Sequence, residues 1–148
     1  MIQAEDVRTL REATGVSMME CKKALEEAGG DMEKATQLLK ARGASVAQKK
    51  SSREQRSGTV HAYVHGGRRG AIVKLLCETD FVARAEAFQT LAHDLAMQVV
   101  ASEASTVDEL YALPFLKDES MTVKEHIEQV IGVIGENITV AEFTRLEL

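Results

Sequence analysis

The hydrophobic period of this chain changes near Gly58, and this change limits the folds open to it. Before Gly58, apolar residues recur at the three- and four-residue spacing of helices. After it, residues 60–65 alternate, with Val60, Ala62 and Val64 pointing to one side. With 148 residues, the chain has room for a small helical module beside a modest α+β domain.

The part before residue 44 has the pattern of short helices that each carry a start and a stop signal. Gly15 should end the first helix. Ser17 is expected to cap the second, with Glu20 three positions later completing a capping box. Asp31 is expected to cap a third helix that ends at Gly43. We therefore expect a three-helix domain over residues 1–43.

The polar and basic residues 44–57 follow as a linker. This segment either extends the third helix or forms a flexible connector, and its residues favour neither reading. The remainder, residues 58–148, is expected to form one α+β core domain.

The core domain is expected to begin with an antiparallel hairpin whose turn lies at Gly66-Gly67 and ends at Gly70. Amphipathic helices are expected around residues 88–99 and 123–134, the second with a capping box at Thr122 and Glu125. Residues 137–146 are expected to form a third strand. Both helices should cover one face of the resulting sheet.

The formal net charge of −5 argues against a general nucleic-acid-binding protein. Residues 42–56 are locally basic, which is typical of a solvated connector; attraction to an acidic partner or to RNA is the alternative. No apolar stretch is long enough to cross a bilayer, and residues 1–6 lack the features of a secretory signal. We expect a cytoplasmic protein with no membrane contact.

Cys21 and Cys77 lie far apart and form no CxxC pattern, so they are expected to be free, packed thiols. His61 and His65 would share a strand face, which is weak geometry for a metal, and we expect neither metal nor cofactor. No Walker loop, dinucleotide fingerprint or Ser/His/Asp signature is present. A cysteine nucleophile is the enzymatic alternative, but neither cysteine has a local signature.

The second helix carries the first candidate surface. Met19 lies among charged residues, and an adaptable apolar side chain flanked by positive charge suits docking onto another protein. The alternative is that a single exposed apolar residue has no special role, and helical phase slightly favours that alternative. The stripe expected to be buried contains Met18, Cys21, Leu25 and Ala28.

The second candidate is the segment from Thr79 to Arg84, between the second strand and the long helix. Asp80 is suited to cap that helix, which would place Phe81 at a strand-to-helix corner where the ring can project into a partner. If the helix already begins at Phe81, the ring is in phase with Phe88 and belongs to the core. The residues alone leave these two readings open.

Three segments of the chain resemble the elongation factor Ts family. Residues 7–30 are similar to its amino-terminal ubiquitin-associated-like domain, residues 77–84 to its second signature, and residues 134–138 to a third. The segments occur in the family's order. The resemblance implies an α+β protein with an N-terminal three-helix ubiquitin-associated-like module followed by a small three-stranded antiparallel sheet packed with helices. It also implies that residues 58–148 form a core domain of the dimerisation type.

The resemblance also implies a function in translation. Such a protein is not an enzyme: it is a guanine nucleotide exchange factor that binds elongation factor Tu–GDP and promotes GDP release by disturbing the magnesium and phosphate site. It binds no nucleotide directly, no cofactor and no specific nucleic acid. The residues implied to contact the GTPase domain are Met18, Met19, Lys22, Lys23, Thr79, Asp80, Phe81 and Val82.

The chain departs from many members of this family in one respect. They carry a second core subdomain and a protruding coiled coil, and the segment from Ala101 to Pro114 is too short for either. A single core subdomain should not reach both contact areas on the GTPase. We therefore hypothesise a homodimer that supplies the second surface.

Overall fold

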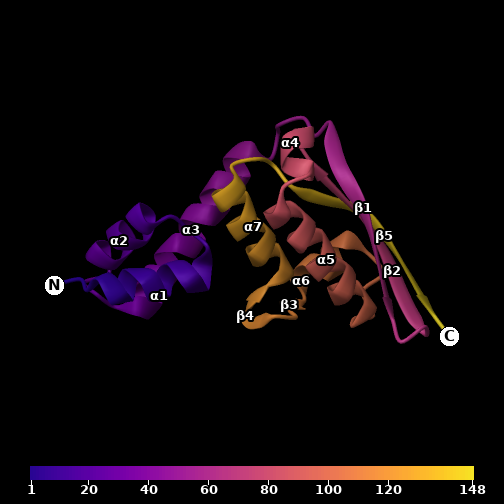
Figure 1. Cartoon of the computed structure of the whole chain (residues 1–148), viewed down its shortest axis with the longest axis horizontal. Helices are drawn as coiled ribbons and strands as arrows, with labels where there is room; N and C mark the ends of the chain where they lie inside the picture. The colour runs from indigo at the N-terminus through magenta and orange to yellow at the C-terminus, as the bar shows by residue number, and fades with distance from the viewer.

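A computed structural model describes all 148 residues and shows two parts joined by one long helix (Figure 1). The amino-terminal part contains α1 (Ala4–Thr14), α2 (Met18–Glu27) and the first half of α3 (Met32–Lys50). These helices enclose a small core of their own, made of Val7, Leu10, Cys21, Ala24, Leu25, Ala35 and Leu39.

The expected caps at Gly15, Ser17 and Asp31 are confirmed, but the capping box at Ser17 is not complete, because the Glu20 carboxylate pairs with Arg42 and Lys23 instead. Gly15 follows α1 in the left-handed conformation, with φ 71°. The Ser17 hydroxyl accepts a hydrogen bond of 3.3 Å from the backbone N–H of Glu20, and the Asp31 carboxylate accepts one of 3.0 Å from Lys34. Each bond satisfies an N–H group that the helix itself leaves free.

The expected helix end at Gly43 is wrong, because α3 continues through this residue to Lys50. Of the two readings of the linker, its first residues therefore extend the helix. Gly43 lies against α7, where an added β-carbon would be 3.4 Å from the carbonyl oxygen of Glu128. The glycine thus serves the close approach of two helices instead of ending one.

The sheet has the order β1-β2-β5 and is antiparallel throughout. The hairpin of β1 (Ser57–His65) and β2 (Arg69–Cys77) is confirmed, with Gly66 and Gly67 at positive φ in its turn. The third strand, β5 (Thr139–Glu147), begins two residues later than expected.

One face of the sheet is covered by α5 (Glu86–Val100), which packs against β1 and β2 (Figure 1). The β2 side chains that face this helix are buried: Ala71, Val73, Leu75 and Cys77. The opposite face has no covering element and exposes Val60, Val64, Ile72 and Leu146.

The second amphipathic helix, α7 (Val123–Ile134), begins at the expected capping box of Thr122 and Glu125. It was expected to cover the sheet beside α5, but it packs mainly against α3. At this contact Gly132 faces Gly43, and the absence of side chains on both residues allows the two helices to come close. The core-facing side of α7 still contributes Val123, Ile127 and Ile131 to the main core.

Three short elements lie between α5 and α7, where no helix or strand was expected: α6 (Val107–Ala112), β3 (Pro114–Phe115) and β4 (Asp118–Thr122). The buried amide of Gln98 anchors this segment. Its Oε1 accepts a bond of 2.7 Å from Leu116, and its Nε2 donates one of 3.2 Å to the carbonyl of Pro114. The last element, α4 (Asp80–Ala83), is a single turn between β2 and α5. None of the helices is both long and apolar enough to span a membrane.

Candidate functional site

An exposed phenylalanine lies at the corner where β2 leads into α4. The side chain of Phe81 is 83% exposed, whereas Phe88 is fully buried. The two are out of phase because Ala85, with φ −68° and ψ 143°, separates α4 from α5. The reading in which Phe81 belongs to the core is therefore wrong, and the ring projects from the surface.

The cap of α4 is Thr79 and not Asp80, which corrects the sequence-based assignment. The Thr79 hydroxyl accepts a hydrogen bond of 3.3 Å from the backbone N–H of Val82, because Thr79 is the last residue with extended backbone. Asp80 is then the first helical residue, and its exposed carboxylate accepts a hydrogen bond from the Ser57 hydroxyl. Val82 is only 8% exposed and fixes the corner to the core.

A carboxylate from another part of the chain holds the start of this corner. Glu136, in the turn between α7 and β5, accepts hydrogen bonds of 3.1 Å from the backbone N–H groups of Glu78 and Thr79. It also accepts one of 2.8 Å from the Thr79 hydroxyl. In return, the Glu78 carboxylate accepts a bond of 2.9 Å from the N–H of Asn137. We call this reciprocal pairing of the turns 78–79 and 136–137 the carboxylate clasp.

The linker that leads from α3 to β1 is tied to the same place. Asn137 is 3% exposed, and its amide donates to the carbonyl groups of Ser51 at 3.4 Å and Arg53 at 3.2 Å. The Arg53 guanidinium lies 3.8 Å from the Glu78 carboxylate. Sequence reasoning missed these contacts. No local pattern indicates them, since the partners lie far apart in the chain.

The exposed methionines of α2 form the second candidate surface. Met18 and Met19 are 46% and 67% exposed, and both line a shallow depression with Ile2, Val7 and Lys22. The expected burial of Met18 is wrong: Met18 is the first residue of the helix, and the buried stripe begins at Cys21 and includes Ala24. The result is an apolar patch larger than Met19 alone would provide.

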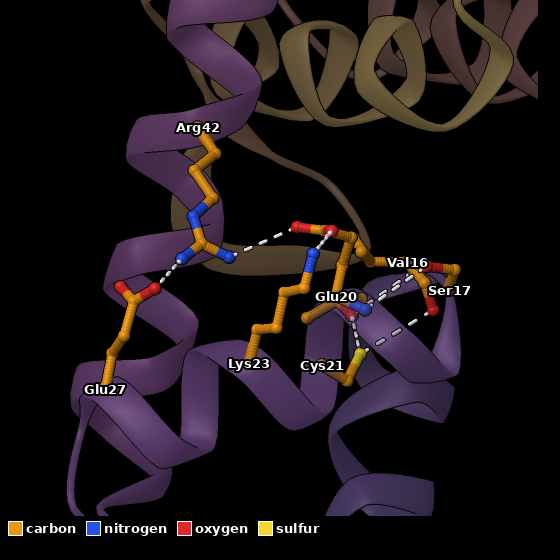
Figure 2. Close-up of polar contacts among 8 residues, drawn as sticks. Val16, Ser17, Glu20, Cys21, Lys23, Glu27 and Arg42 are labelled. Atoms are coloured by element: carbon orange, nitrogen blue, oxygen red, sulfur yellow. Dashed lines mark hydrogen bonds and ion pairs between the residues drawn. The ribbon is translucent and has the colours of Figure 1, made fainter.

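The charged side of α2 is bound to α3 by one arginine (Figure 2). Arg42 donates a hydrogen bond of 3.2 Å to Glu20 and one of 2.6 Å to Glu27. Lys23 lies 3.4 Å from the same Glu20 carboxylate, and the exposed Lys22 lies 3.9 Å from Glu26. Both lysines are paired along the helix and can be shared with an acidic partner at little cost, because exposed pairs are weak.

Three of the five basic side chains in the stretch 42–56 are paired within the chain, and Lys49 and Lys50 are not. Besides Arg42, Arg53 faces Glu78 and Arg56 lies 2.9 Å from Glu54. These pairs reduce the positive charge that this stretch could offer to RNA, and so they weigh against the RNA-binding alternative.

Both cysteines are fully buried free thiols, as the sequence predicted. Burial raises the pKa of Cys77, and the neighbouring Glu136 carboxylate raises it further. Because the thiolate is the reactive form, Cys77 is a poor nucleophile. The chemistry of the site therefore favours binding over covalent catalysis.

Known proteins resemble this chain along its whole length. A family model described as "Elongation factor TS" matches residues 78–148. An "Elongation factor Ts" of Moorella thermoacetica is 38% identical over 194 residues, which cover 100% of this chain and 96% of that protein. The same name is carried by a protein of Gloeothece citriformis, 39% identical over 99% of this chain and 68% of its own length.

Some relatives are considerably longer. An "Elongation factor Ts" of Clostridium kluyveri is 45% identical over 99% of this chain, which corresponds to 48% of that protein. The alignment with the Moorella protein runs over 194 residues, more than the 148 of this chain. That relative therefore contains internal residues with no counterpart here. The matched range 78–148 includes both the Phe81 corner and the carboxylate clasp.

Proposed function

Because this chain belongs to the elongation factor Ts family, we propose that it is the guanine nucleotide exchange factor of elongation factor Tu. It binds elongation factor Tu–GDP and promotes release of GDP. The observation that carries this proposal is Phe81, an aromatic ring 83% exposed on a firmly anchored corner. An exposed ring of this kind, without a partner inside its own fold, is typical of an interface anchor.

The physical basis of exchange is thermodynamic linkage. A protein that binds the nucleotide-free form of a GTPase more tightly than the GDP form must weaken GDP binding by the same factor. The charges of Mg²⁺ and the phosphates dominate nucleotide affinity, so displacing the groups that hold them is effective. GTP then reloads the partner and expels the exchange factor.

The corner at α4 supplies the group that enters the GTPase domain. Phe81 inserts near the magnesium and phosphate site, and the exposed carboxylate of Asp80 accompanies it. Thr79 and Val82 support this corner: Thr79 caps the helical turn, and Val82 is buried against the core. Neither needs to leave its position for Phe81 to make contact.

The methionine patch on α2 supplies the second contact. Met18 and Met19 offer apolar surface, and Lys22 and Lys23 flank it with positive charge. Residues 1–43 act as the docking domain, 44–57 as the connection and 58–148 as the core that carries the wedge. In Figure 1, α2 and α4 lie apart with α3 between them, so one partner can be held at two points.

No bond is made or broken on this chain in the proposed reaction, and the protein acts as a binding partner and not as an enzyme. It works in the cytoplasm, beside the translating ribosome that elongation factor Tu serves. It needs no cofactor and makes no direct contact with nucleotide.

A second copy of the chain would cover the open face of the sheet. Val60, Val64, Ile72 and Leu146 expose apolar side chains there, and such patches mark protein interfaces. The homodimer would also supply the surface of the missing subdomain. Light scattering after gel filtration should show a dimer for the wild type and a monomer for Val64→Lys; a monomeric wild type, alone and with its partner, would remove the dimer from the proposal.

The function itself is tested by release of labelled GDP from elongation factor Tu at increasing concentrations of this chain. The release rate should rise and saturate, as expected when exchange proceeds through a ternary complex. A release rate that is independent of the chain at all concentrations would overturn the proposed function.

A further inference from the structure

We propose that Glu136 is a positioning residue for nucleotide exchange, which holds the Asp80–Phe81 corner in the pose that enters the partner. This inference rests on the proposed function and assigns a role to a residue outside the set that is proposed to contact the GTPase. Glu136 acts through Thr79, the cap of α4, with which it shares two hydrogen bonds.

The geometry of the clasp restrains the corner from one side. Three donors converge on the Glu136 carboxylate: the N–H groups of Glu78 and Thr79, both at 3.1 Å, and the Thr79 hydroxyl at 2.8 Å. Hydrogen bonds to an ionised group are stronger than neutral ones. Together they fix the backbone immediately before α4 and the orientation of the capping side chain.

The turn that carries Glu136 is itself fixed by its neighbouring residues. Gly135 adopts the left-handed conformation, with φ 86°, at the end of α7, and this directs the chain toward the β2–α4 turn. The next residue, Asn137, donates its N–H to Glu78 and its amide to the linker. The clasp therefore cannot shift as a unit without breaking buried hydrogen bonds of Asn137.

The corner needs this support because α4 is short and its aromatic side chain is exposed. The helix α4 has four residues, far too few to be stable alone. Phe81 is 83% exposed and makes no core contact that would hold its ring. Val82 and Ala83 attach the turn to the core, and hydrogen bonds join Ser57 to the Asp80 carboxylate and Gln89 to the carbonyl of Ala83. These contacts hold the turn itself, whereas the backbone N–H groups of Glu78 and Thr79 before it bond to Glu136.

A loosened corner should affect exchange in a specific way. The first encounter through α2 is unchanged, so the concentration of chain that gives half-maximal exchange should hardly move. Insertion of Phe81 into the nucleotide-bound GTPase requires the correct pose, and a flexible corner must lose freedom to adopt it. The maximal exchange rate should therefore fall.

The test compares three variants. Glu136→Ala removes all three hydrogen bonds, whereas Glu136→Gln keeps the shape and an oxygen that can accept the two N–H bonds. Glu109→Ala is the matched control: this carboxylate also accepts a backbone N–H, at 2.9 Å, and a hydroxyl, at 3.2 Å, both from Ser105, but at the start of α6. Two quantities are measured for each: saturating GDP release from elongation factor Tu, and hydrogen exchange at the Ala83 and Arg84 amides of α4.

We expect Glu136→Ala to lower the maximal rate roughly tenfold, with the half-saturating concentration changed less than about twofold. Its Ala83 and Arg84 amides should exchange faster. Glu136→Gln should recover most of the rate, and Glu109→Ala should match the wild type in both measurements. A wild-type maximal rate in Glu136→Ala, or an equal loss in Glu109→Ala, would overturn the inference.

The two measurements separate this inference from the proposed function. If the wild-type chain does not accelerate GDP release, the proposed function fails and the role in exchange fails with it. The amide measurement then still decides whether Glu136 restrains the corner: unchanged exchange at Ala83 and Arg84 in Glu136→Ala would refute the restraint itself.

Discussion

Gly132 of α7 faces Gly43 of α3 so closely that a β-carbon on Gly132 would lie 3.6 Å from the Cα atom of Gly43. This contact forms the joint between the two parts of the molecule. Side-chain contacts strengthen it: Nε2 of Gln129 donates to the carbonyl of Thr14 at 2.8 Å, and Nζ of Lys40 donates to the carbonyl of Ser120 at 3.4 Å and lies 3.8 Å from the Glu125 carboxylate. The joint sets the relative placement of the α2 patch and the α4 corner.

A large side chain at this joint should separate the two helices. Gly132→Leu should lower the free energy of unfolding by about 1–3 kcal/mol, the usual effect of overpacking. Gly132→Ala is the control: one methyl group at 3.6 Å is ordinary contact, and alanine favours the helix by about 1 kcal/mol. Urea unfolding measures both, and a Gly132→Leu protein as stable as the wild type would contradict close packing here.

The exposure of Phe81 predicts that its removal leaves the fold intact. Phe81→Ala should change the free energy of unfolding by less than about 0.5 kcal/mol, as at other surface sites. Phe88→Ala, at a fully buried ring, should cost about 3–5 kcal/mol. Denaturant titrations of the two variants give the comparison; equal losses would mean that Phe81 is packed in solution.

Truncation of the α2 patch should weaken association with elongation factor Tu. Met19→Ala should cost on the order of 1 kcal/mol of binding free energy, or about fivefold in the dissociation constant. Val133→Ala, at an apolar residue of α7 that is 48% exposed, is the matched control and should bind as the wild type. Calorimetry with the nucleotide-free partner decides, and equal affinities for Met19→Ala and wild type would exclude Met19 from the interface.

His126 should make the stability of the core depend on pH. Its ring stacks on Phe115 with the centroids 3.9 Å apart. Burial lowers the pKa of His126 below its ordinary 6.5, although the Asp94 carboxylate opposes this shift. A base with a lowered pKa in the folded state takes up its proton more readily when unfolded, so stability falls as pH drops through 6.5.

Unfolding free energies measured between about pH 7.5 and pH 5.5 test this effect. His126→Gln should show a shallower decline toward acid than the wild type. Some decline should remain, because burial also lowers the pKa of His61. An identical slope in the two proteins would show that His126 does not contribute.

Elements with local signals were predicted correctly from the sequence. Ser17, Asp31 and Thr122 cap the helices they were expected to cap, because a capping side chain acts within three residues of its own position. The hairpin followed from strict alternation and the Gly66-Gly67 turn.

The wrong predictions lie where contacts with a distant part of the chain determine the local structure. Gly43 has the signal of a helix end, but its contact with α7 gives it another role. Asp80 was predicted to be the helix cap, but Thr79 caps α4. The Thr79 hydroxyl is held by a hydrogen bond to Glu136, which lies in a distant turn. The segment from α6 to β4 is anchored by hydrogen bonds to Gln98 of α5. No periodicity in the residues of this segment predicts its structure.

In the proposed function, the exposed ring of Phe81 drives GDP from elongation factor Tu. The most direct measurement is the saturating rate of labelled GDP release with wild-type chain and with Phe81→Ala, after both are shown to fold and to bind the partner. We expect the variant to lose at least about tenfold of the maximal rate while it still binds through α2. Equal maximal rates for the two proteins would show that the ring of Phe81 does not drive GDP release.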